Sequence, residues 1–81
     1  MTGIIAMLTW ECMKTGIRMN RNRLLCIASS DASPIVEFFR RSDDFSNDWI
    51  SFLITDDVSH LMKCIDRLIE RVNQRLAEEL R

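Results

Sequence analysis

The last third of the chain carries its most regular pattern of hydrophobic and polar positions. Between Asp56 and Leu80, apolar residues recur at helical spacing and fall within an arc of roughly 120° on a helical wheel. They are Val58, Leu61, Met62, Ile65, Leu68, Ile69, Val72, Leu76 and Leu80. The pattern predicts one long amphipathic helix, capped by Thr55 or Asp56, with Asp56 and Asp57 at the positive end of its dipole.

Four shorter apolar segments precede this helix, and their aromatic and β-branched residues favour strands. The segments are residues 3–13, 23–29, 35–41 and 49–55. Residues 42–48 are polar around a single Phe45 and read as a loop. The segment 35–41 is ambiguous, because Ser33 as an N-cap and Pro34 at the first position would also suit a helix.

These elements predict an α+β fold in one domain spanning residues 1–81. Three or four short strands form a small antiparallel sheet, because the connections are too short for parallel crossovers, and the long C-terminal helix packs on it. A βαβα arrangement, with residues 35–41 helical, is the second possibility. An all-α bundle is the third.

Composition narrows the function classes without naming one. The 81 residues are 47% hydrophobic with a formal net charge of -1, so the chain resembles neither a disordered segment nor a strongly basic nucleic-acid coat. Cys12, Cys26 and Cys64 are odd in number and far apart, which is typical of reduced thiols in a cytoplasmic protein. We expect no cofactor and no metal, because the sequence contains no motif for either. We expect no membrane span, because the apolar runs are too short to cross a bilayer.

Charged residues form two segments of opposite sign. Lys14, Arg18, Arg21 and Arg23 lie within ten residues that contain no acid, and they are the candidate nucleic-acid patch. Acids gather in Asp43, Asp44, Asp48, Asp56 and Asp57, which we interpret as loop and capping residues. Because the two segments are complementary, they could pair within the fold or orient two subunits.

Two other groups of residues could carry chemistry or contacts. His60 and Cys64 are four residues apart on the long helix, yet a Cys–His catalytic pair also needs an orienting group and a pocket. Five of the six aromatic residues, Phe38, Phe39, Phe45, Trp49 and Phe52, are predicted to form the core under the helix.

The long helix is also the main indication of function. At about 37 Å it exceeds what strands of about six residues can cover, so its last turns need another partner. We therefore expect a small non-enzymatic protein that acts through protein–protein contacts as a homodimer, in a regulatory, adaptor or inhibitor role. Val72, Leu76 and Leu80 are the candidate self-association surface. The alternative is a nucleic-acid-binding regulator that uses residues 14–23.

Overall fold

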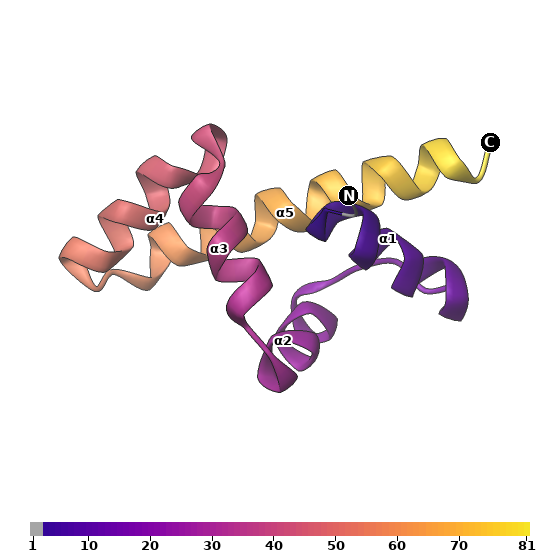
Figure 1. The fold of residues 1–81 in the computed structure, drawn as a ribbon, viewed down its shortest axis with the longest axis horizontal. Coiled ribbons are helices and arrows are strands. Elements are labelled where there is room, and N and C mark those ends of the chain that lie inside the picture. Colours follow the sequence, from indigo (N-terminus) through magenta and orange to yellow (C-terminus); the bar gives the residue numbers. More distant parts are fainter. Residues whose placement is uncertain (1–2) are drawn as a thin grey trace.

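The computed structural model describes residues 3–81, which form five helices and no strand (Figure 1). The helices are α1 (Ile4–Thr15), α2 (Arg21–Ser30), α3 (Ser33–Arg41), α4 (Asp43–Thr55) and α5 (Val58–Glu79). The predicted α+β fold is therefore wrong, and so is its βαβα variant. The all-α arrangement, which the sequence placed third, is the one observed.

The long helix α5 is the axis on which the other helices are arranged. Figure 1 shows α4 beside its first half, antiparallel to it, and α1 beside its second half. Helix α3 packs on α4 and also touches α1, and α2 packs against α5. The result is elongated, with extents of 40 × 23 × 22 Å.

The predicted long helix is confirmed, with a small shift at its beginning. Helix α5 starts at Val58, and its N-cap is Asp57, whose carboxylate accepts a hydrogen bond of 2.9 Å from the Ser59 backbone N–H. Thr55 instead serves the end of α4: its hydroxyl donates to the Ser51 carbonyl at 2.7 Å. The cap is thus one or two residues later than expected.

Short connections hold α3, α4 and α5 in sequence. Ser42 alone separates α3 from α4, and Asp56 and Asp57 separate α4 from α5. Asp56 adopts a left-handed conformation (φ 59°), and its N–H closes α4 by donating to the Phe52 carbonyl. Aspartate tolerates this conformation better than most residues, so a two-residue turn can reverse the chain.

All four segments that were predicted as strands are helical. The helical alternative for residues 35–41 is correct, with Pro34 in the first turn of α3 and Ala32, rather than Ser33, at the N-cap. Residues 43–48, predicted as a loop, are the first half of α4. Strand propensity depends strongly on context, and these segments gain more by laying one helical face against α5 or, for α3, against α4.

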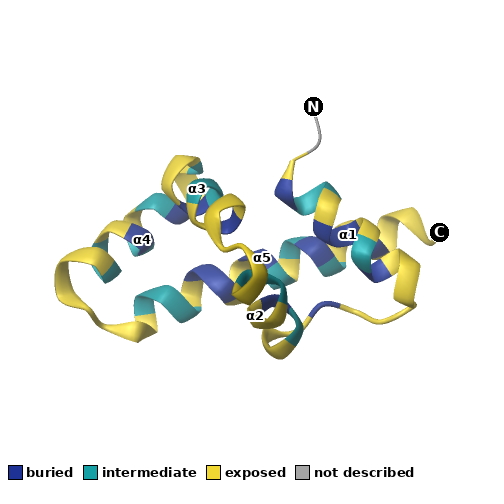
Figure 2. Ribbon diagram, turned by 60° about the horizontal axis from the view of Figure 1, so that its bottom comes forward, coloured by how far each residue is buried: buried dark blue, intermediate teal, exposed yellow. Residues whose placement is uncertain are grey.

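The buried side chains form one continuous core along α5 (Figure 2). Phe39, Phe45 and Leu68 fill it on the side of α4, and Leu8 and Val72 fill it on the side of α1. Helices α4 and α1 therefore cover the apolar stripe of α5 from Leu61 to Leu76, whereas Val58 and Leu80 at its ends stay exposed. In residues 3–81, every buried side-chain nitrogen and oxygen has a hydrogen-bond partner.

Candidate interaction surfaces

The predicted self-association residues lie mostly inside the monomer. Val72 is fully buried and Leu76 is 6% exposed, because α1 of the same chain lies along this part of α5. Only Leu80, at 69% exposure, remains on the surface. We expected the end of the stripe to lack cover because a short sheet could not reach it. Helix α1 covers it instead, so the length of α5 no longer argues for self-association.

The basic segment is largely engaged in contacts within the fold. The Arg21 guanidinium makes a two-point ion pair with Asp66 of α5, at 2.6 and 2.8 Å. This pairing raises the pKa of Arg21 and lowers the pKa of Asp66. Lys14 pairs with Glu11 at 3.1 Å, one turn earlier on α1. Arg18 makes no ion pair with any described residue.

Arg23 fastens α2 to the end of α1. Its guanidinium donates to the carbonyls of Glu11, at 3.0 Å, and Ile17, and to the Thr15 hydroxyl at 2.7 Å. The end of a helix carries partial negative charge, and hydrogen bonds from a charged donor are stronger than neutral ones, so a guanidinium is favourable here. The sequence could not distinguish this structural role from phosphate binding, because both use an arginine among polar neighbours.

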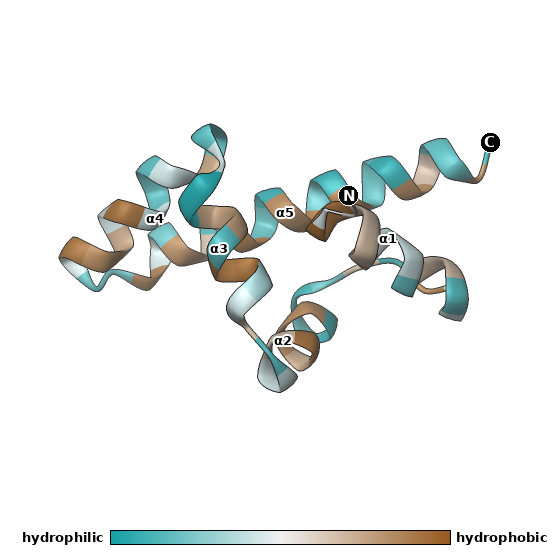
Figure 3. Ribbon diagram, viewed as in Figure 1, coloured by the Kyte–Doolittle hydropathy of each residue, from teal (hydrophilic) through white to brown (hydrophobic). Residues whose placement is uncertain are grey.

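Several large apolar side chains are exposed where α4 turns into α5. We call this group the hairpin tip and define it as Ile50, Leu53, Ile54 and Val58, which are 52%, 63%, 78% and 64% exposed. Figure 2 shows this end as exposed, and Figure 3 shows hydrophobic residues along α4 there. Contiguous apolar side chains left in water commonly mark a site of protein or membrane contact.

Helical spacing explains why the tip faces outward. Phe45, Trp49 and Phe52 recur at i, i+4 and i+7, and they turn one face of α4 into the core. Ile50, Leu53 and Ile54 lie on another face. Sequence reasoning missed this surface because it treated residues 49–55 as a strand buried on both faces, although the aromatic spacing was present.

The aromatic residues form the core cluster that the sequence predicted, without a sheet. The rings of Phe39 and Phe45 stack at a centroid distance of 5.4 Å, and Phe38 meets Phe45 edge-on at 5.0 Å. In a strand, Phe38 and Phe39 would point to opposite faces, whereas in α3 both reach Phe45. The Arg71 guanidinium also lies over the Phe45 ring, 5.1 Å from its centroid.

His60 and Cys64 do not form a pair. The His60 Nδ1 atom lies 3.4 Å from the Asp48 carboxylate of α4, and its side chain is only partly exposed. Cys64 is buried and donates its thiol hydrogen to the Phe45 carbonyl at 3.6 Å. Burial, helped by the nearby Asp48 charge, raises the pKa of this thiol, which is opposite to the activation of a nucleophile.

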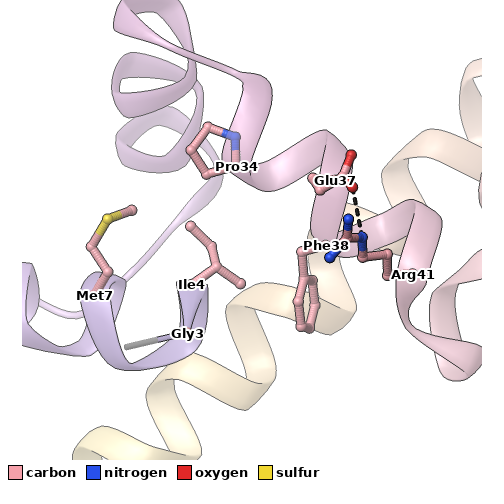
Figure 4. A pocket seen from close by; sticks show the side chains of 7 residues that line it. All are labelled: Gly3, Ile4, Met7, Pro34, Glu37, Phe38 and Arg41. Carbon is pink, nitrogen blue, oxygen red and sulfur yellow. Dashed lines mark ion pairs between the residues drawn. The ribbon is translucent and has the colours of Figure 1, made fainter. Parts of the chain in front are cut away.

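Two hollows adjoin the core. One of about 470 Å³ lies between the start of α1 and α3, where Ile4 and Met7 face Phe38 and the Glu37–Arg41 ion pair of 2.6 Å (Figure 4). The other, of about 240 Å³, lies among α2, α3, α4 and α5, and all its lining residues are apolar. Small-molecule sites usually orient a ligand with a few convergent polar groups. The first hollow offers two charged side chains that already pair with each other, and the second offers no polar side chain for this purpose.

Searches for metal sites, membrane spans and similar proteins gave no match. Across residues 3–81, no cluster of three or more His, Cys, Asp or Glu side chains is placed to hold a metal ion. In the same part of the chain, no helix combines the length and apolarity required to cross a membrane. No family model, curated protein or solved structure matches the chain.

Proposed function

We propose that this chain is a small non-enzymatic protein that works through protein–protein contacts, with a homodimer as its working form. The observation that supports the proposal is the hairpin tip. Its four large apolar side chains are each more than half exposed, although apolar side chains elsewhere on α4 and α5 are largely buried. Covering them with another protein surface would remove this apolar area from water.

A protein partner fits the tip better than a lipid surface does. Residues 43–57 contain five aspartates and no lysine or arginine, and Asp56 and Asp57 directly flank the apolar side chains. Cellular membranes commonly present anionic headgroups, which repel such a segment and attract basic ones. The same charges favour a protein surface that carries cations beside apolar residues.

Binding of nucleic acid through Lys14, Arg18, Arg21 and Arg23 stays a prediction. It has less support than protein contact, because Arg21 and Lys14 form ion pairs within the chain and Arg23 is bonded to carbonyls of the preceding segment. A gel-shift assay at low salt with the three arginines changed to glutamine tests it. An unchanged shift, or none with the natural chain, contradicts nucleic-acid binding.

Sedimentation equilibrium at tens of micromolar chain tests the proposed function. We expect a dimer for the natural protein and a monomer for the double variant Leu53→Gln, Ile54→Gln, with helical circular dichroism retained in both. Leu25→Gln is the matched control, because Leu25 is also an exposed leucine on a helix (51%) but lies on α2, away from the tip. A monomeric natural protein, or a double variant that dimerises like the control, contradicts the proposal.

A further inference from the structure

Asp56, in the turn into α5, and Lys14 and Arg18, at the end of α1 and just after it, lie at opposite ends of the molecule. Helix α4 and its turn into α5 form one end in Figure 1, and α1 with the C-terminal half of α5 forms the other. Asp56 is therefore separated from Lys14 and Arg18 along the 40 Å axis of the molecule and cannot pair with them within a single copy. Asp44 and Arg21 lie nearer the middle, where they pair with Arg71 and Asp66 of α5.

Part of the acidic charge of residues 43–57 is used within the fold. Asp44 forms an ion pair with Arg71, and Asp48 lies beside His60. Asp57 caps α5, and this hydrogen bond lowers the pKa of its carboxyl, which keeps it ionised. Asp43 and Asp56 are exposed and make no ion pair with any described residue.

The opposite end combines apolar side chains with cations. We call it the α1 outer face and define it as Met7, Trp10, Met13 and Ile17, all exposed, with Trp10 at 57%. Lys14 is one helical turn beyond Trp10, and Arg18 directly follows Ile17. Residues 3–30 contain four cations and one acid, Glu11.

The α1 outer face matches the hairpin tip in chemistry. Each surface has four exposed apolar side chains. Asp56 and Asp57 flank the hairpin tip, whereas Arg18 and Lys14, which also pairs with Glu11, flank the α1 outer face. Helix α1 is apolar on all sides, and a helix with this pattern is normally covered on more than one face. Trp10 is the residue type that most often anchors a protein interface.

We propose that the hairpin tip of one copy docks on the α1 outer face of a second copy, with Asp56 and its neighbours facing Lys14 and Arg18. This inference rests on the proposed homodimer and adds which surfaces of the two copies meet and how the copies are oriented. Two elongated copies side by side and antiparallel bring each tip beside the other copy's α1. A two-fold axis then makes the same contact twice and closes the assembly at two chains.

Charge reversal at the two ends tests this docking. Asp56→Lys and Arg18→Glu both lie in connecting segments, so neither replaces a helical residue. Each variant alone places like charges at both contacts of its own dimer, and we expect its dissociation constant to rise about tenfold or more. Sedimentation equilibrium measures this rise, with circular dichroism as the check on folding.

An equimolar mixture of the two variants distinguishes docking from a general effect of charge. In the mixed dimer, one contact pairs the two reversed side chains and the other pairs the two natural ones, so both contacts are attractive. We expect the mixture, and also the single chain that carries both substitutions, to dimerise like the natural protein. Lys63→Glu, an exposed reversal on α5 that adds negative charge, is expected not to weaken the dimer.

The outcomes separate the docking from the proposed function. If the natural protein dimerises and both single variants do so equally well, the homodimer stands and the docking is overturned. Weakened single variants that neither mixing nor combination restores also overturn it. A monomeric natural protein overturns both. If Asp56→Lys lowers helicity, Asp56→Asn is used in its place, because asparagine also tolerates the left-handed conformation. An Asp56→Asn dimer of unchanged affinity then counts against the docking.

Discussion

At the scale of single residues, polar side chains attach α1 and α2 to α5. The Asn73 side chain accepts a hydrogen bond from the Met19 N–H at 2.9 Å and donates one to the Met19 carbonyl at 3.0 Å. It therefore satisfies both backbone groups of a buried residue in the α1–α2 connection. Met19 and Asn73 are 54 positions apart, so no local sequence pattern could indicate this contact.

Arg23 and Arg18 belong to one basic segment, and the structure assigns them different environments. We expect Arg23→Gln to lower the free energy of unfolding by about 1–3 kcal/mol, because carbonyls at the end of α1 lose a charged donor. Arg18→Gln is the matched control, with an expected change within about 0.5 kcal/mol, as for most surface substitutions. Urea unfolding followed by circular dichroism measures both. Equal effects would contradict the role given to Arg23.

At the scale of elements, the central fact is that α1 and α4 together cover α5. We expected the end of the apolar stripe to lack cover within the chain, but α1 covers Val72 and Leu76, and Leu80 alone stays exposed there. Helix α1 contributes Ile4, Leu8 and Cys12 to that cover. Helix α1 shows no clear apolar stripe because it is apolar on two faces. One face packs on α5, and the other is the exposed α1 outer face.

Substitutions of Leu76 and Leu80 test where the buried part of the α5 apolar stripe ends. We expect Leu76→Ala to destabilise the fold by about 2–4 kcal/mol, because it leaves a cavity under α1. Leu80→Ala, one turn later and exposed, should change stability by less than about 0.5 kcal/mol. Thermal unfolding at several protein concentrations measures both. A Leu76→Ala loss that appears only where the chain dimerises would place this residue in an interface instead.

At the scale of the whole molecule, several carboxylates stabilise the helices by forming ion pairs or by capping a helix. Glu37 pairs with Arg40 on α3, Asp66 pairs with Arg21 across α5 and α2, and Asp57 caps α5. Hydrogen bonds to these carboxylates lower the pKa of each. Their charged forms therefore favour the folded state.

The stability of the monomer is expected to fall on acidification. The folded chain binds these protons less tightly than the unfolded chain, so protonation favours unfolding. The loss begins near the ordinary carboxyl pKa values of about 4 and continues as the pH falls through the lowered values. Urea midpoints between about pH 6 and about pH 3 measure it. Asp66→Asn should reduce the pH dependence, and midpoints that rise on acidification would contradict the assignment.

Much of α5 and of the core could be predicted from the sequence. The stripe from Val58 to Leu76 defines a helix by itself, because its length and periodicity leave no other regular structure. Five aromatic residues were correctly assigned to the interior. Asp57 lies at the beginning of this helix as expected, but it is itself the N-cap in place of Thr55 or Asp56, and Asp56 instead closes α4.

Only the tertiary structure decided what the remaining segments become and which surfaces stay free. Residues 3–13 and 49–55 are too short and too uniformly apolar for periodicity to separate helix from strand, so packing against α5 decides their form. That packing also buries Val72 and Leu76, engages Arg21 and Arg23, and leaves the hairpin tip and the α1 outer face exposed. Local sequence fixes a periodic helix, whereas the cover of its apolar face depends on contacts between residues far apart in the chain.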